Sequence, residues 1–235
     1  METAEQKIAR LLKTPPIFNW VQHVFPRSDD TLRSLERLAQ RPIGRSLRST
    51  YRLCAELAYR EIDFEEAQQQ IDKKLQGYSQ AAAKEIVPVF YEEITRRQFD
   101  TIPEYKGENF PYPIGRAPDG NTLTIPIAPT FVAFEAGRLL PVFVLGWRSP
   151  IRKLHRIRLV SAIIHRSILT WQEFQGSDAL IMTFCTGRWS NAREPQSWYT
   201  SRYADMSDAE LQEHFDRYNK ALHHVIAELK DEKFD

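Results

Sequence analysis

The sequence predicts an α+β fold in which a helical N-terminal layer precedes a small mixed sheet flanked by helices. Three observations predict it. Apolar residues recur at three- and four-residue spacing over about the first hundred positions, a period typical of amphipathic helices. Turn-forming residues then gather between Asp100 and Pro118, and short apolar runs of strand length follow. We therefore expect a helical layer at residues 1–100 and an α/β core at 101–235, an arrangement equally compatible with one continuous domain.

Capping and helix-breaking residues bound the helices of the first part. Thr3 begins a short amphipathic run that stops at Pro15, and Asp29 begins a second run that stops before Pro42. Two further helices are expected at residues 46–60 and 63–99, the latter with bends at Gly77 and Pro88.

Strands and helices alternate in the second part. An antiparallel meander is expected from residues 122–127, 130–135 and the apolar run Val142 to Leu145. A helix over about 149–168, a strand at 179–185 and a polar loop should follow. The pattern Ser207-Asp208-Ala209-Glu210 is a capping box, which predicts a last helix reaching about Lys230.

Composition limits the class of protein. With 235 residues and 42% hydrophobic content, the chain is long enough to bury a core of its own. Cys54 and Cys185 are the only cysteines, too few for a disulfide framework or a cysteine-based zinc site. Neither a membrane-spanning apolar run nor a signal-peptide stretch is present, so we expect a cytoplasmic protein without a membrane partner.

The order of helices, strand hairpin, helix, strand and helix over roughly residues 80–230 resembles the core of the PD-(D/E)XK nuclease superfamily, in particular its RecB-like branch. The resemblance implies a restriction-endonuclease-like fold, with one acid on the hairpin, an acid and a lysine two residues apart on the next strand, and a glutamine on the following helix. Gly146 stands at the acid position and Arg148 at the lysine position. Pro129, Thr130 and Phe131 lie where the hairpin acid is expected, and Arg156 or Arg158 lies near the position of the glutamine.

These departures predict a site that binds without cutting. Mg²⁺ takes oxygen ligands, and a hydrolytic site also needs a group that positions or deprotonates water. Gly146 supplies no ligand, and the arginine at position 148 stays protonated and cannot act as a base. We therefore expect no metal-dependent cleavage, and no cofactor, at this site.

Charge along the chain favours a nucleic-acid partner. No Asp or Glu occurs from Ala136 to Gln172, although the segment is rich in Arg and Lys. On the expected helix, three- and four-residue spacing would form one basic stripe, and arginines of the later polar loop would extend it. The candidate phosphate-binding residues are Arg148, Arg152, Lys153, Arg156, Arg158, Arg188 and Arg193. A solvated helix face is the alternative interpretation.

A second basic stripe recurs every four residues in the N-terminal part, and its members are Arg33, Arg37, Arg41, Arg45, Arg48 and Arg52. Like charges at this spacing repel one another, so a compensating partner is expected. Nucleic acid and the acidic segment from Asp205 to Asp235 are both candidates.

Three functions remain open from the sequence. The first is a non-catalytic subunit that binds DNA, RNA or a nucleoprotein partner through an inactivated nuclease-like core. The second is a metal-dependent nuclease with a rearranged site in which Glu92 and Glu93 act with Glu135 or Asp119. The third is a scaffold that docks another protein through the aromatic loops around Trp171 and Trp198, residues that equally suit base stacking or closure of the sheet.

Overall fold

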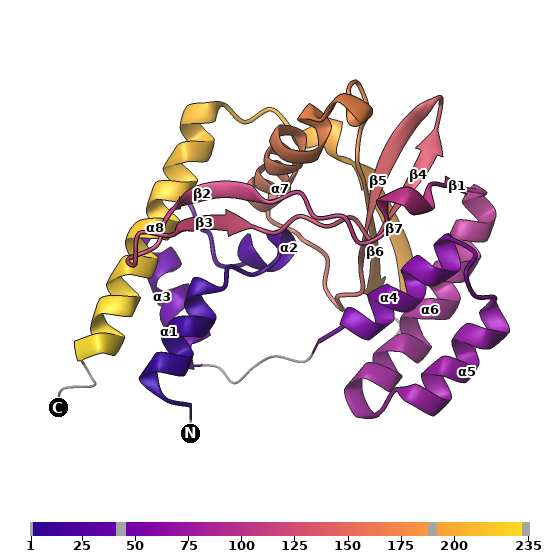
Figure 1. Ribbon diagram of the computed structural model, residues 1–235, viewed down its shortest axis with the longest axis horizontal. Helices are drawn as coiled ribbons and strands as arrows, with labels where there is room; N and C mark the ends of the chain where they lie inside the picture. The colour runs from indigo at the N-terminus through magenta and orange to yellow at the C-terminus, as the bar shows by residue number, and fades with distance from the viewer. Residues whose placement is uncertain (1, 41–45, 188–191, 232–235) are drawn as a thin grey trace.

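The computed structural model describes residues 2–40, 46–187 and 192–231. A five-stranded mixed sheet lies between two helical layers, and a two-stranded hairpin extends from it (Figure 1). The α+β class predicted from the sequence is therefore confirmed. Among the described helices, none is both long and apolar enough to cross a membrane.

The main sheet has the order β1-β4-β5-β6-β7. These strands are β1 (Asp100–Thr101), β4 (Phe131–Glu135), β5 (Arg138–Leu145), β6 (Leu180–Thr186) and β7 (Arg193–Tyr199). Only β5 and β6 run parallel, with Val142 opposite Leu180, because helix α7 (Leu154–Ser167) crosses over between them. The run Val142 to Leu145 is buried throughout, as its apolar sequence predicts.

Alternate residues of β5 enter two separate cores. Val142 and Val144 pack against α4 (Arg48–Ala58), α5 (Phe64–Lys74) and α6 (Gly77–Arg97) on one face. Phe143 and Leu145 enter the core on the other face, which α7 and α8 (Asp208–Asp231) cover. A strand buried on both faces reads as a continuous apolar run, which is what β5 shows.

The first hundred residues do not form one helical layer. Helices α1 (Ala4–Leu12), α2 (Ile17–Trp20) and α3 (Ser28–Gln40) join α7 and α8, whereas α4 to α6 lie across the sheet from them (Figure 1). Trp20 anchors the first group, because it is fully buried with its ring centroid 5.3 Å from that of Tyr218. The segment between α3 and α4 therefore separates two groups of helices on opposite faces.

Three strands lie where loops were expected: the two-residue β1, β2 and β7. The segment 100–118 contains β2 (Tyr112–Arg116), which pairs with β3 (Thr122–Ile125) in a separate hairpin, so the predicted three-strand meander is wrong. Pro113 and Gly115 concealed β2, and the register shifts between them. Strand β7 was concealed by its polar side chains and Pro195, which an edge strand tolerates.

Helix boundaries also differ from the expectation. The helix predicted at 63–99 is two helices, because Gly77 has a φ of +53° that breaks the chain between α5 and α6. Helix α7 begins at Leu154 rather than at 149. Residues before it remain extended because the Arg148 carbonyl oxygen accepts hydrogen bonds from the backbone N–H and the hydroxyl of Thr186. The capping box of α8 is confirmed, since Ser207 and Glu210 bond reciprocally.

Candidate functional site

The candidate site lies at the carboxyl ends of β5 and β6. Because these two strands are parallel, their carboxyl ends meet at the same edge of the sheet, a position where open α/β sheets commonly hold ligands. Gly146 follows β5 directly, and the segment that leads to α7 then crosses the end of β6. Gly146 and Arg148 are therefore adjacent in space as well as in sequence.

Arg193 is the centre of this site. Its side chain is only 3% exposed and comes from the first residue of β7. One terminal nitrogen, Nη1, donates to the carbonyl oxygens of Phe184 at 2.8 Å and Gly146 at 3.2 Å, so the guanidinium joins the ends of β6 and β5. Its Nε and Nη2 atoms bond Glu85 Oε2 at 2.9 and 2.8 Å. Arg193, a phosphate-binding candidate from the sequence, is thus buried and paired within the fold.

Glu85, on α6, joins this arginine to a second one. Its Oε1 accepts a hydrogen bond from Arg148 Nη2 at 3.0 Å, while its Oε2 is occupied by Arg193. The Arg148 side chain is 63% exposed, so only one of the two arginines is withdrawn from solvent. The cluster of two arginines and one glutamate carries a net charge of +1. Arg148 is the member that presents this charge to solvent.

The surroundings of Gly146 leave no room for an acidic side chain without rearrangement. A Cβ atom at this position would overlap Ile86 Cδ1, so Ile86 would have to move. The Gly146 N–H donates to the hydroxyl of Tyr51 at 3.1 Å. Burial raises the pKa of Tyr51 to about 12, although the bond from Gly146 opposes this shift, so the hydroxyl stays protonated at neutral pH.

The predicted basic stripe does not lie along one helix. Arg152 and Lys153 precede α7, and only Arg156 and Arg158 belong to it. Arg152 is exposed near the end of β6, where its charge and that of Arg193 act on Cys185. Burial nevertheless raises the pKa of that thiol. Arg152 makes no ion pair within the described part of the chain.

Lys153 and Arg156 pack against the segment that follows α2. Their cationic groups lie 5.3 and 4.8 Å from the centroid of the Phe25 ring. Arg156 also donates to the side-chain oxygen of Gln22 at 2.6 Å and to its carbonyl oxygen at 2.9 Å. Burial lowers the pKa of Arg156. Arg156 therefore serves the packing of α7 and is not a free phosphate ligand.

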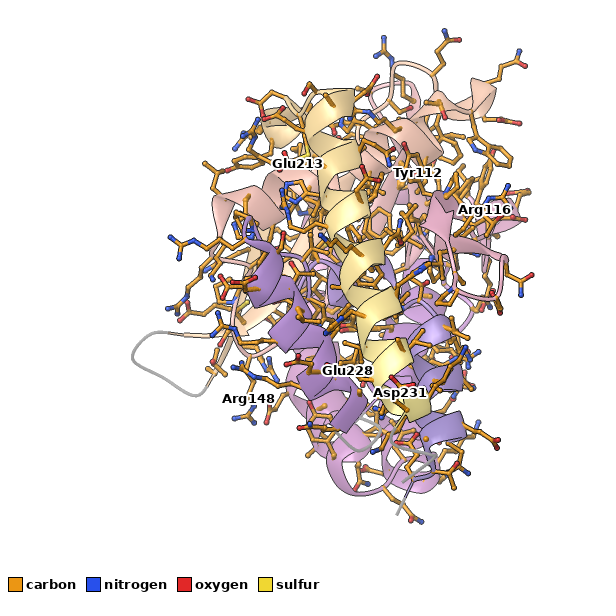
Figure 2. The ribbon with its side chains drawn as sticks, turned by 90° about the vertical axis from the view of Figure 1, so that its left-hand side faces the viewer. Tyr112, Arg116, Arg148, Glu213, Glu228 and Asp231 are labelled. Atoms are coloured by element: carbon orange, nitrogen blue, oxygen red, sulfur yellow. The ribbon has the colours of Figure 1, made fainter. Side chains whose placement is uncertain are left out.

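Arg158 and Arg166 hold acids at the start of α8. Arg158 bonds Asp205 Oδ1 at 3.1 Å and lies 3.9 Å from Glu210, and Arg166 bonds Asp208 Oδ1 at 2.7 Å. Figure 2 looks onto α8 and shows Glu213 toward one end, Glu228 and Asp231 toward the other, and Arg148 to one side. The first acids of the C-terminal segment thus neutralise arginines of α7. From the sequence, this segment is expected only as a partner for the second basic stripe, Arg33 to Arg52.

The second basic stripe is described only in part, because Arg41 and Arg45 lie outside the described residues. Arg33 pairs with Asp30 and Arg52 with Glu56, both within their own helices. Arg48 begins α4, is exposed, and makes no ion pair within the described ranges. It is the member of this stripe that lies at the candidate site, because it lines a cavity there together with Tyr51 and Trp147.

Of the arginine and tryptophan residues in the later loops, some lie outside the described residues, one packs in the fold and one is exposed. Arg188 and Trp189 lie outside the described residues. Trp198 packs edge-on against Tyr203 at 5.5 Å between ring centroids, which agrees with closure of the sheet, whereas Trp171 is 52% exposed.

The alternative metal site is not assembled. Arg96 and Arg97 both bond Glu93; burial raises the pKa of this carboxyl, but the two arginines outweigh it and hold the pKa below its ordinary value. Glu135 accepts hydrogen bonds from the Tyr199 hydroxyl, and Glu92 is exposed. In the ranges that the structure describes, no group of three or more His, Cys, Asp or Glu side chains is arranged to hold a metal ion.

Sequence reasoning missed Glu85, Tyr51 and the role of Arg48. Glu85 lies in a helix of mixed composition and carries no motif, and its nearest functional partner is 63 residues away. Tyr51 lies within the helix expected at residues 46–60, where no motif marks it. The one available signal for Arg48 was its position next to Tyr51 after a proline- and glycine-containing break.

Fold and site together define a class of protein: an α+β chain with helices on both faces of a mixed sheet and an arginine–glutamate–arginine cluster at the carboxyl end of its parallel strand pair. Comparison with protein-family models, with curated proteins and with solved structures finds no match.

Proposed function

We propose that this protein binds the backbone of DNA or RNA at the carboxyl ends of β5 and β6 and does not cut it. The order of elements supports a nuclease-like ancestry for the core. An antiparallel hairpin of β4 and β5 is followed by α7 and then by β6 parallel to β5, as the resemblance to the PD-(D/E)XK superfamily implies.

One observation carries the proposal. At the strand end where such a nuclease holds its metal, this chain has an ion cluster in which both oxygens of its one carboxylate, Glu85, are occupied by arginines. A carboxylate bound in this way is a poor ligand for Mg²⁺, which requires several free oxygen donors. The exposed guanidinium of Arg148 carries a positive charge at the same place, and this charge attracts a phosphate. Because the guanidinium stays protonated, it cannot act as the base that takes a proton from an attacking water molecule.

Neighbouring cations extend this charge. Arg48 lines the cavity beside Trp147, and Arg152 is exposed in the segment that leads to α7; neither has an acidic partner within the described residues. Three cations on one edge suffice for weak, salt-dependent binding to a polyanion, since each contacted phosphate releases condensed counterions.

Free cysteines Cys54 and Cys185 are both buried, which agrees with work in a reducing cytoplasm.

The test measures the affinity of the purified protein for short single- and double-stranded DNA and RNA between about 50 and 200 mM salt. We expect binding that weakens steeply with salt. Arg148→Gln combined with Arg152→Glu should weaken it about tenfold for every sequence and reduce the salt slope by about 1 to 2, because two phosphate contacts are lost.

A matched control is Lys73→Glu combined with Lys74→Gln, which removes the same amount of positive charge from the exposed end of α5. This control should change affinity much less than the site variant. No binding at the lowest salt, or equal loss in both variants, would reject the proposed interface. Circular dichroism of both variants shows that the fold is kept.

A further inference from the structure

A cavity of about 700 Å³ opens at the candidate site. Residues of α2, α4, the start of α6 and the last residues of β5 line it, and its volume lies within the range of small-molecule sites. The cluster around Glu85 adjoins it through Tyr51, whose ring lines the cavity and whose hydroxyl contacts Gly146. Tyr51 therefore links the cavity to the backbone at the end of β5.

Three hydroxyl groups of the lining are oriented in the same manner. The oxygens of Thr130, Tyr51 and Ser46 accept the backbone N–H groups of Val144, Gly146 and Arg48 at 3.0, 3.1 and 3.1 Å. A hydroxyl that accepts such a bond keeps its own hydrogen for donation. Within the described residues, none of the three donates that hydrogen to another protein group. The cavity thus presents oriented donors.

Its charge has one sign. Arg48 lines the cavity, and no Asp or Glu of the described residues does. Tyr51 remains a donor at neutral pH because burial raises its pKa to about 12. A lining with one guanidinium, three hydroxyl donors and no carboxylate favours a ligand that is negatively charged and rich in hydrogen-bond acceptors, and it disfavours a cation.

Apart from Asn19, the remaining walls are aromatic and apolar. Phe18 is buried, Trp147 is half-buried, and Tyr78 is 40% exposed. Flat aromatic walls suit a flat ring in the ligand, which stacks on them without regard to sequence. The ligand chemistry that combines a planar ring, many acceptors and a negative charge is that of a nucleotide.

We propose that this cavity binds one nucleotide, with its base against the aromatic wall of Trp147 and Tyr78 and its phosphate toward Arg48. The nucleotide is either free or an unpaired position of a bound strand. In the second case the inference rests on the function proposed above, and the cavity then favours single-stranded over fully paired nucleic acid.

The experiment titrates the full chain with each of the four ribonucleoside 5′-monophosphates at low salt, by calorimetry and by tryptophan fluorescence. The four nucleosides and inorganic phosphate are titrated in parallel. We expect the monophosphates to bind, and the nucleosides and phosphate each to bind at least about tenfold more weakly, because each has lost one half of the interaction.

Two variants locate the binding. Arg48→Gln should weaken monophosphate binding about tenfold and leave nucleoside binding unchanged, since the phosphate contact is removed. Ala128→Trp, at an exposed residue of the lining, should abolish both by filling the cavity without disturbing a core. Arg202→Gln is the control, because Arg202 is exposed outside the lining and should leave the affinity unchanged.

The outcomes separate the two proposals. The inference is overturned if the monophosphates do not bind. It is also overturned if they bind Arg48→Gln and Ala128→Trp as tightly as the unaltered chain. In either case the proposed oligonucleotide binding is judged by its own test. Monophosphate binding without oligonucleotide binding leaves the cavity as a site for a free nucleotide and rejects the proposed function. If both monophosphate and oligonucleotide bind, a competition experiment decides between the two sources. A monophosphate that displaces a bound single strand but not a bound duplex assigns the cavity to an unpaired base.

Discussion

At the scale of single residues, neighbours in space determine what each arginine of the basic block does. Arg193 is buried against two carbonyl oxygens and a carboxylate, Arg156 is held by Gln22 and Phe25, and Arg148 keeps most of its surface in water. A guanidinium has five donors and no acceptor, so a buried one must find several oxygens. Residues of one type and one charge therefore divide into structural and binding roles.

Glu85→Gln tests this division. Arg193 would keep its charge in a nearly closed position without its counter-charge, so we expect the free energy of unfolding to fall by about 2 kcal/mol, less than the ~3–5 kcal/mol of a fully buried pair because Glu85 is 34% exposed. Arg148→Gln, which removes the exposed partner of the same carboxylate, should cost less than about 1 kcal/mol. Urea denaturation measures both. Equal losses would show that Arg148 is as structural as Arg193.

Asp178 provides a second prediction, on pH. Burial raises the pKa of Asp178, but its polar partners outweigh burial and hold the pKa far below the ordinary value. The Asp178 carboxylate accepts hydrogen bonds from the Thr200 hydroxyl at 2.8 Å and from the backbone N–H groups of Ala179 and Ser201. His165 lies 3.8 Å from the same carboxylate. A depressed pKa in the folded state stabilises the fold above the unfolded pKa, and this stabilisation is lost as pH falls through the folded value.

We therefore expect Asp178→Asn to cost about 2 kcal/mol at neutral pH, and the difference from the unaltered protein to shrink below about pH 4. Urea unfolding curves recorded from neutral pH to about pH 3 give the two free energies. Asp119→Asn, in the exposed turn between β2 and β3, should change stability by less than about 0.5 kcal/mol. A difference that stays constant over this range contradicts the assignment.

At the scale of elements, the hairpin of β2 and β3 depends on a close approach to α8. Gly115 has a φ of +144°, and a Cβ there would overlap the side-chain amide of Asn219. That amide donates to the Ile114 carbonyl oxygen at 2.6 Å, and His223 of α8 contacts the Arg116 carbonyl oxygen at 2.8 Å. The hairpin thus contacts α8 through its backbone, and Figure 2 shows Tyr112 and Arg116 of β2 to one side of α8.

Gly115→Ala should lower the free energy of unfolding by about 2 kcal/mol, because it adds both backbone strain and overlap. Gly120→Ala is the matched control: its φ of +86° also favours glycine, but its Cβ would meet no atom within 4 Å, so about 1 kcal/mol of strain is expected. Combining Gly115→Ala with Asn219→Ala should cost less than the sum of the single changes. Additive losses would show that the two residues do not interact.

At the scale of the whole molecule, one sheet separates two cores, and the candidate site lies where the N-terminal helices of both sides approach the end of β5. Asn19 comes from α2 on one side, and Tyr51 and Tyr78 come from α4 and α6 on the other. A site assembled from both groups of helices needs the complete chain. Truncation to the predicted α/β core, residues 101–235, would remove three of its walls.

The whole-molecule prediction is the absence of catalysis. Purified protein should not cleave DNA or RNA with Mg²⁺ or Mn²⁺, because both oxygens of the Glu85 carboxylate, which faces the end of β5, are engaged by arginines. Gel assays on single- and double-stranded substrates measure this. Metal-dependent cleavage that disappears in Glu85→Gln would establish a nuclease at this site. Cleavage that disappears in Glu92→Ala or Glu93→Ala would establish the rearranged acidic site instead.

Much of the fold could be predicted from local patterns. The α+β class, the buried run of β5 and the capped helix α8 follow from apolar periodicity and from the pairing of Ser207 with Glu210, which act within a few residues. The patterns failed where tertiary contacts override local preference. Polar β7 became a strand by pairing with β6, and the residues before α7 stayed extended because Thr186 bonds the Arg148 carbonyl oxygen.

By itself, the sequence determined the α+β class, the apolar run of β5, the capped start of α8, and that a glycine and an arginine follow the end of β5. Only the tertiary structure decided which charges are free, because the partners that neutralise a charge come from distant segments: Arg193 lies 108 residues from Glu85, and Arg158 lies 47 from Asp205. Local spacing contains no information about such pairs. Coulomb attraction and hydrogen-bond satisfaction act over a few ångströms in space, so the fold had to bring these residues together before their roles could differ.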